Sequence, residues 1–406
     1  MQPLSRQPAS WMAAHGRVLA ALGAPIVGVR ERDVRFVGGI VRNWLLGEPL
    51  GDVDIATPDT PDVVMERLKS AGLKAVPTGL DHGTITAVDG GLTYEITTLR
   101  RDTACDGRHA AVEFTDDWAE DARRRDFTIN AMSLAPDGTL FDYHGGAEDA
   151  AAGKVRFVGN AADRIQEDYL RILRLFRFQA RYGRSDIDNA TLDAVRAHAK
   201  GLARLSAERI TQELAKLLAA KNPAPVVAVM TTTGVIGEIL PEEQPGPALT
   251  RLIAREHETP APADWLRRFA VLLPEATAAI AARWKLSNAD AQRLAALLAP
   301  DPVLGPATSV TNLNRALYHL GQGVVIDRLL IAWAKDGDDP AWKQQLARAN
   351  AWTDKTFPLS GGDVLKLGLA PGPQVGELLR AVEDWWIEGG FAADRDAALA
   401  ELARRA

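Results

Sequence analysis

The sequence predicts an α+β protein in which a small mixed β-sheet occupies the first part of the chain and only helices follow. Short apolar runs bounded by glycines, which are typical of strands and tight turns, gather in the first 155 residues. Beyond Lys221, Ala- and Leu-rich stretches of about 10–15 residues show helical periodicity without alternation and are separated by Pro and Gly. With 406 residues, the chain is long enough for two or three domains.

The composition limits the class of protein and of partner. Hydrophobic residues make up 47% and charged residues 25% of the chain, as in ordinary globular proteins. No run of about 18 apolar residues occurs, and the first ten residues lack the apolar core of a signal peptide, so we expect a cytoplasmic protein. The single cysteine, Cys105, allows neither an internal disulfide nor a thiolate metal cluster. Because the net charge is −6, RNA binding would need local clusters of Arg and Lys.

A glycine pair followed by an acidic pair is the first functional signal. Gly38 and Gly39 separate a short apolar strand from an apolar helix that carries Arg42 and ends at Gly47. Paired glycines before a helix let backbone amides approach an anion, and the helix start adds the positive end of its dipole. The glycine pair alone, or the acidic pair alone, would be typical of an ordinary turn. Both together, about a dozen residues apart, favour a phosphate site.

The acidic pair consists of Asp52 and Asp54, which we place on a second short strand over residues 52–55. Carboxylates at i and i+2 of a strand point to the same face. On that face they can hold divalent cations against a phosphate, as in sites where two metals lie roughly 3.5–4 Å apart.

A third carboxylate, Glu95, lies in the second of two further predicted strands, over residues 83–88 and 92–99. A carboxylate within a buried strand is costly unless it is paired or binds a metal. The alternative, a glutamate on an edge strand that faces water, stays open at this point. Residues 100–118 are polar and without periodicity, which predicts a mobile loop.

A charged motif over residues 124–132 is suited to bind a nucleotide. Arg124 and Arg125 present planar guanidinium groups that match phosphate oxygens. Asp126 and Asn130 supply the acceptor and the amide that a ribose hydroxyl needs.

We expect one long helix over residues 163–182, whose arginines recur mostly at spacings of three and four. No acidic residue follows Asp168 until Asp186, so the arginines predict a basic stripe, with Arg177 and Arg181 as RNA contacts. Asp168 and Arg171 lie at i and i+3. We expect them to form a weak intrahelical ion pair, and such a pair also presents an acceptor and several donors that can read the edge of a base. The stripe consists of Arg164, Arg171, Arg174, Arg177, Arg181 and Arg184.

The motifs G-G-x-V-R, L-L-G and D-x-D-I resemble the head of class II tRNA nucleotidyltransferases (CCA-adding enzymes) and bacterial poly(A) polymerases. Both belong to the polymerase-beta-like nucleotidyltransferase superfamily. R-R-D-x-x-x-N-A-M resembles the family's ribose-binding motif, E-D-x-x-R its base-selecting motif, and E-R-I-x-x-E, from Glu208, the motif that follows. The family commonly has Asp where this chain has Asn43, so a role carried by a charge at that position does not transfer.

The resemblance implies a site for nucleotidyl transfer. Asp52 and Asp54 would hold two Mg²⁺ ions, which prefer oxygen ligands, and Glu95 would complete the acidic site. Asp106-Gly107-Arg108 resembles the loop that helps CCA-adding enzymes switch between bases. The implied nucleotide-binding residues are Gly38, Gly39, Arg42, Arg124, Arg125, Asp126, Asn130, Asp168, Arg171 and Arg174.

The resemblance also implies a catalytic head (1–155), a helical neck for base recognition (156–220), and a helical body and tail for tRNA binding (221–406). The implied reaction is template-independent addition of CMP and AMP, from CTP and ATP, to the 3′ end of tRNA. No membrane and no protein partner are expected. Two alternatives stay open: a poly(A) polymerase, which shares the head motifs, and a catalytically silent RNA-binding relative. Such a relative would be expected to lose the acidic pair that this chain keeps.

Overall fold

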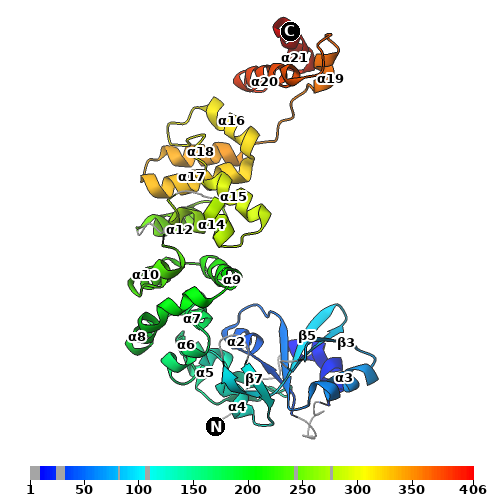
Figure 1. The fold of residues 1–406 in the computed structure, drawn as a ribbon, viewed down its shortest axis with the longest axis vertical. Helices are drawn as coiled ribbons and strands as arrows, with labels where there is room; N and C mark the ends of the chain where they lie inside the picture. The colour runs from blue at the N-terminus through cyan, green and yellow to red at the C-terminus, as the bar shows by residue number, and fades with distance from the viewer. Residues whose placement is uncertain (1–9, 24–32, 81–82, 106–109, 242–245, 275–277) are drawn as a thin grey trace. The chain divides into compact units, whose positions relative to one another are not determined.

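The computed structural model describes residues 10–23, 33–80, 83–105, 110–241, 246–274 and 278–406. The chain divides into two compact units, Met1–Pro241 and Glu242–Ala406 (Figure 1). The first unit contains the sheet and the helices that follow it directly. In the described part of the second unit only helices occur, as the sequence predicts.

A seven-stranded mixed sheet forms the centre of the first unit, in the order β3-β4-β5-β2-β1-β8-β9. Only β2 and β5 run parallel among the paired neighbours, and all the other pairs are antiparallel. This confirms the predicted small mixed sheet. The strands are β1 (Arg35–Val37), β2 (Val53–Thr57), β3 (Lys74–Gly79), β4 (Thr84–Asp89), β5 (Leu92–Thr98), β8 (Met132–Leu134) and β9 (Leu140–Asp142).

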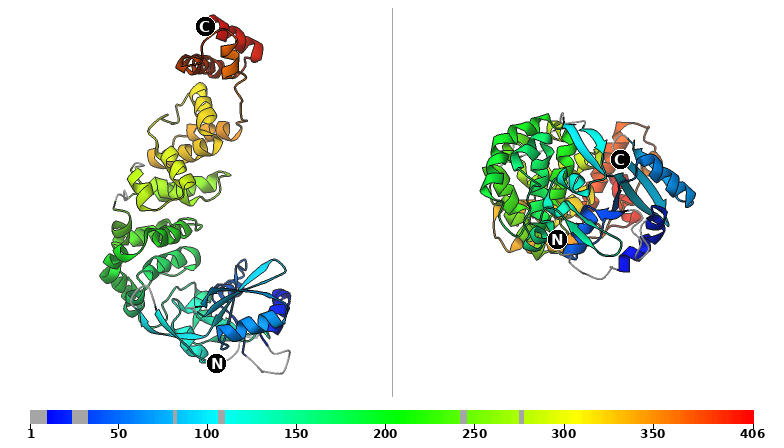
Figure 2. Two further views of the ribbon diagram at one scale, coloured as in Figure 1. Left: turned by 45° about the vertical axis from the view of Figure 1, so that its right-hand side comes forward. Right: turned by 90° about the horizontal axis from the view of Figure 1, so that it is seen from below.

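One face of the sheet is buried under the N-terminal helices (Figure 2). Val53, Ile55, Tyr94 and Ile96 point into that core. Because side chains alternate along a strand, the residues between them face the other way, where the pocket described below lies. The covering helices are η1 (Ser10–His15), α1 (Gly16–Ala21), α2 (Gly39–Leu46) and α3 (Pro61–Ser70).

The prediction of a loop over residues 100–118 is wrong. Residues 100–118 do not form a loop, because β6 (Arg100–Cys105) and β7 (Ala110–Phe114) pair as an antiparallel ribbon before α4 (Trp118–Arg123). The sequence of β6, Arg-Arg-Asp-Thr-Ala-Cys, does not alternate between apolar and polar residues, so periodicity does not indicate a strand there. The predicted base-switching loop, Asp106-Gly107-Arg108, lies outside the described residues.

The long helix predicted over residues 163–182 is interrupted at Asp168, which has an extended backbone (φ −155°, ψ 107°). Its carboxylate accepts a hydrogen bond of 3.0 Å from the backbone N–H of Leu170, which starts the next helix. Tyr169 packs on Gly201, where an added Cβ would lie 2.1 Å from the tyrosine ring. The break is therefore associated with specific side-chain contacts, one of them to a residue far along the chain, that helical periodicity does not reveal. The helices are α5 (Gly146–Ala152), α6 (Ala161–Glu167), α7 (Leu170–Tyr182), α8 (Asn189–His198), η4 (Ala199–Arg204), α9 (Ala207–Leu218), α10 (Ala224–Thr232) and α11 (Val235–Ile239).

The second unit is built around a buried network of charges. Glu256 accepts hydrogen bonds from the guanidinium groups of Arg267 and Arg268, and Arg267 also binds Asp327 at 2.7 Å. None of the described helices has the length and apolarity needed to cross a membrane. The helices are α12 (Ala248–Glu258), α13 (Trp265–Leu272), α14 (Ala278–Arg283), α15 (Asn288–Leu298), α16 (Val310–Leu320), α17 (Gln322–Asp336), α18 (Ala341–Asn350), α19 (Gly361–Leu365), α20 (Pro373–Glu388) and α21 (Arg395–Arg405).

Candidate active site

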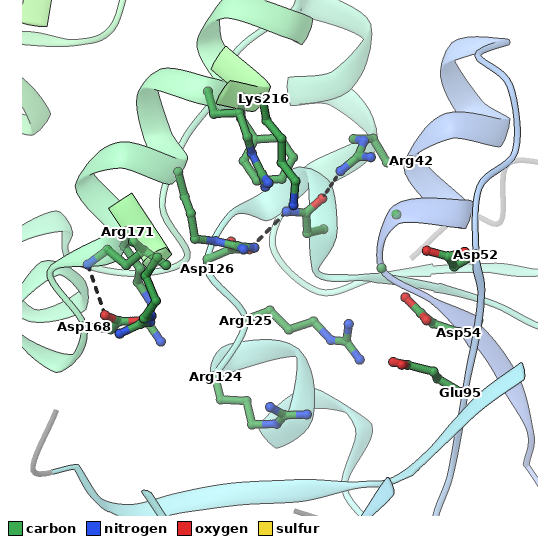
Figure 3. Close-up of a pocket in the computed structure, with 18 residues that line it drawn as sticks. Arg42, Asp52, Asp54, Glu95, Arg124, Arg125, Asp126, Asp168, Arg171 and Lys216 are labelled. Atoms are coloured by element: carbon green, nitrogen blue, oxygen red, sulfur yellow. Dashed lines mark hydrogen bonds and ion pairs between the residues drawn. The ribbon is translucent and has the colours of Figure 1, made fainter. Parts of the chain in front are cut away.

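A pocket of about 830 Å³ lies on the open face of the sheet, within the first unit (Figure 3). Eight Arg and Lys side chains and five Asp and Glu side chains line it, so its walls carry a positive excess. It brings together every residue predicted for catalysis and nucleotide binding. The lining residues are Gly38, Gly39, Arg42, Asp52, Asp54, Glu95, Arg124, Arg125, Asp126, Asn130, Asp168, Leu170, Arg171, Arg174, Arg177, Phe178, Arg209 and Lys216.

Three carboxylates form one wall of the pocket. Asp54 on β2 lies directly across from Glu95 on β5 in the parallel register, and Asp52 immediately precedes β2. Figure 3 shows the three side chains directed toward the same space. Since β5 lies between β4 and β2, the alternative of an edge-strand glutamate is wrong.

Negative charge accumulates on this acidic wall. Burial raises the pKa of Asp54 to about 6, the negative charges of Glu95 and Asp52 add to the rise, and Arg125 opposes it. Carboxylate oxygens are the ligands that hard divalent cations prefer, so the residues fit such an ion. No group of three or more His, Cys, Asp or Glu side chains converges as a ready-made metal cluster among the described residues. Water or phosphate oxygens would therefore complete the coordination of a cation.

The glycine turn opposes the acidic wall. Gly38 has a φ of +72°, a conformation that L side chains rarely adopt. A Cβ added there would lie 3.4 Å from Arg125 Nη1 and 3.6 Å from Asp54 Oδ2. The absence of a side chain keeps the start of α2, with its free backbone amides, open to the pocket.

The arginine motif is organised by two buried acids. Asp121 binds Arg124 at 2.7 Å and Arg125 at 3.0 Å, so two cations share one anion and leave a positive excess toward the pocket. Asp126 accepts hydrogen bonds from Arg174 Nε (2.7 Å) and Asn130 Nδ2 (3.0 Å). Burial raises the pKa of Asp126, but the positive charge of Arg174 and these hydrogen bonds outweigh burial, and the net shift is downward.

The predicted ion pair between Asp168 and Arg171 is wrong, because each side chain has another partner. Asp168 Oδ2 accepts a hydrogen bond of 2.7 Å from Arg209 on α9. Arg171 pairs with Glu167 and donates to the backbone carbonyl of Arg164 at 2.8 Å. Both Asp168 and Arg171 still line the pocket, so the base-edge interpretation stays open.

The arginines of the predicted stripe do not lie along one side of a single helix, because Arg164 is on α6 and Arg184 lies beyond the end of α7, and this part of the prediction is wrong. Arg164 is buried, and Arg177 pairs with Glu213 on α9 at 3.2 Å and lines the pocket. Arg184 donates to backbone carbonyls of α5. Arg181, which stacks on Tyr182, is exposed and outside the pocket. RNA contacts at Arg177 and Arg181 stay a prediction.

Sequence reasoning missed two cations of the pocket. Arg209 and Lys216 both lie on α9, 41 and 48 residues beyond Asp168. Arg209 belongs to the E-R-I-x-x-E motif, so a signal for it was present. Lys216 follows that motif in an ordinary helical pattern, and nothing in the sequence marked it.

Comparison with known proteins identifies the family. Residues 34–156 match the model described as the poly A polymerase head domain, and residues 186–245 match the "Probable RNA and SrmB- binding site of polymerase A". The chain is 37% identical over 383 residues to the mitochondrial CCA tRNA nucleotidyltransferase 1 of Mus musculus, which covers 92% of this chain and 87% of that protein. The chain belongs to the CCA-adding tRNA nucleotidyltransferase family.

Further members of the family agree. The CCA-adding enzyme of Limosilactobacillus fermentum is 32% identical over 369 residues, which cover 89% of this chain and 90% of that protein. The crystal structure of Bacillus stearothermophilus CCA-adding enzyme in complex with CTP matches with a TM-score of 0.78 at 28% identity, over 98% of both chains. The predicted resemblance and fold class are therefore confirmed. The domain boundaries at residues 155 and 220, and the role of each site residue, stay predictions.

Proposed function

We propose that this member of the CCA-adding family adds CMP and AMP, from CTP and ATP, to the 3′ end of tRNA without a nucleic-acid template. The observation that carries the proposal is that one pocket brings together residues suited to bind a metal, the phosphates and the base. Carboxylates lie on one side, Asp168 and Arg171 on the other, and Arg124 and Arg125 between them (Figure 3). The names of the relatives, and the CTP complex of one of them, support this assignment.

The pocket supplies the groups that nucleotidyl transfer requires. The terminal 3′-hydroxyl oxygen of the RNA forms a bond to the α-phosphorus, the bond between this phosphorus and its bridging oxygen breaks, and pyrophosphate leaves with the electron pair. Asp52 and Asp54 would hold the divalent metal, for which Mg²⁺ is the expected ion. The metal, when bound, acidifies the hydroxyl and neutralises phosphate charge. Glu95 adds negative charge to the same wall.

The phosphates would bind where backbone amides and guanidinium groups converge. Gly38 and Gly39 open the start of α2, and Arg42 extends from the same helix. Arg124 and Arg125 contribute the excess charge that Asp121 leaves. Asp126, which Arg174 holds, and Asn130, which donates to Asp126, would contact the ribose.

The base would be selected by protein groups at the opposite end of the pocket. Asp168 offers an acceptor and Arg171 several donors, which together can match the hydrogen-bonding edge of a base. Arg209 and the N–H of Leu170 fix the Asp168 carboxylate. We assign catalysis to the head (1–155), base selection to the neck (156–220) and tRNA binding to the body and tail (221–406). We also retain the cytoplasm as the expected location.

The decisive experiment separates CCA addition from poly(A) synthesis, the activity named by the matching head-domain model. Purified protein is incubated with Mg²⁺, each nucleoside triphosphate alone or in pairs, and tRNA that ends at the discriminator base. We expect two C additions with CTP, one further A when ATP is also present, and then arrest. A long ladder of adenosines with ATP alone, on tRNA or unrelated RNA, would refute CCA addition in favour of the polymerase.

A further inference from the structure

Arg42 is a buried cation whose recorded partners are all neutral. Its Nη1 donates to Asn130 Oδ1 at 2.5 Å (dashed line in Figure 3), and its guanidinium lies 4.3 Å from the centre of the Tyr182 ring. Only 7% of the residue is exposed. Burial lowers the pKa of Arg42. Tyr182 opposes this shift, whereas the positive charges of Arg181 and Arg177 add to it, and the net shift is downward. Among the described residues, no carboxylate forms an ion pair with Arg42.

The neighbouring cations of the pocket differ from Arg42 in this respect. The four arginines of α7 and α9 that line the pocket form ion pairs within the protein, so much of their charge is already compensated. Lys216, the remaining pocket cation on α9, is exposed to solvent rather than buried. Arg42 therefore offers a pocket anion a buried guanidinium that no carboxylate neutralises. The compensated pairs are Arg174 with Asp126, Arg177 with Glu213, Arg171 with Glu167, and Arg209 with Asp168.

The next residue, Asn43, holds Arg42 in place without adding charge. Asn43 Oδ1 accepts hydrogen bonds from Arg42 Nε (3.1 Å) and Arg42 Nη2 (2.9 Å), and also from the Tyr182 hydroxyl (3.3 Å). Its Nδ2 donates to the Pro49 carbonyl at 2.9 Å. Every polar atom of this buried amide is used. An aspartate could reproduce the contacts to Arg42, but it would neutralise the guanidinium and lose the donor to Pro49.

We propose that Asn43 is a positioning residue that orients Arg42 while leaving its charge uncompensated, so that the nucleoside triphosphate supplies the missing counterion. The inference rests on the proposed function only in that the pocket binds a triphosphate. It assigns to the Asn43 side chain a role in affinity for the phosphates, independent of which base is bound.

Two substitutions at one position separate charge from geometry. Asn43→Asp keeps the acceptor and adds a negative charge, whereas Asn43→Ala removes the acceptor and adds none. The affinities of the full-length variants are measured by calorimetric titration with CTP, inorganic tripolyphosphate and cytidine. Titrations at low and high salt show how far each effect is electrostatic. Asn160→Asp is the matched control, because it adds the same charge at an exposed helix N-cap, where either side chain is favourable.

We expect Asn43→Asp to weaken CTP and tripolyphosphate binding by the same factor, about tenfold to a hundredfold at low salt and less at high salt. Asn43→Ala should have a smaller effect, and cytidine binding should not change in either variant. The proposal would be wrong if Asn43→Asp bound tripolyphosphate as tightly as the unchanged protein and Asn43→Ala bound it more weakly. Asn43 would then act only by fixing the geometry of Arg42. An equal loss for cytidine would also overturn the proposal, because it would indicate local distortion. Poly(A) synthesis by the unchanged protein would refute the proposed function and leave this inference standing.

Discussion

Replacing Glu256 with Gln should strongly destabilise the second unit. The Glu256 carboxylate binds two guanidinium groups. Arg267 contacts it through Nε (2.9 Å) and Nη2 (2.6 Å), and Arg268 through Nε (2.8 Å) and Nη2 (2.7 Å). All three side chains are at most 3% exposed. Gln preserves the shape but removes the negative charge between two buried cations. Breaking a buried ion network of this kind costs about 3–5 kcal/mol.

The free-energy loss converts to a measurable temperature shift. In a unit of this size, 1 kcal/mol corresponds to about 2–4 °C, so the midpoint of unfolding should fall by about 6–20 °C. Tryptophan fluorescence reports mainly on this unit, because only Trp11, Trp44 and Trp118 lie outside it.

The matched control lies on the same helix. Glu258 on α12 pairs with Arg255 and Lys343 but is 37% exposed, so Glu258→Gln should cost less than about 1 kcal/mol. Equal midpoints for Glu256→Gln and Glu258→Gln would show that the buried charges do not stabilise the unit, and the reasoning would be wrong.

Three further predictions concern residues of the first unit. Asp54→Ala should abolish nucleotide addition while tRNA binding stays within a few-fold; near-normal turnover with Mg²⁺ would contradict the metal assignment. Asp168→Ala and Arg209→Ala should both raise incorporation of UTP or GTP relative to CTP and ATP, because unmatched polar groups at a reading site change specificity strongly; unchanged selectivity in a misincorporation assay would argue against base reading. Arg181→Gln should weaken tRNA binding and reduce the slope of log K against log salt concentration by roughly one unit. Arg177→Gln should chiefly weaken nucleotide binding. An unchanged slope for Arg181→Gln would argue against the predicted RNA contact.

The parts of the site that local spacing determines could be predicted from the sequence. Asp52 and Asp54 share a face because a strand alternates, and Gly38 marks a turn because its backbone requires glycine. The partner of Asp168 could not be predicted in this way, since Arg209 lies 41 residues away and the pairing depends on how α7 packs against α9. Helical periodicity likewise continues through the break at Asp168, because the apolar residues on both sides keep the same spacing.

If Asp168 selects the base as proposed, that break has a consequence for the fidelity of nucleotide addition. Asp168 belongs to neither helix, and its carboxylate is held by the N–H of Leu170, by Arg209 and by the backbone that Tyr169 anchors on Gly201. A substitution that shifts this anchor by a fraction of an ångström would leave the hydrophobic cores intact. The defect would be the addition of wrong nucleotides to the 3′ end of tRNA, and a screen for expression or thermal stability would not detect such variants.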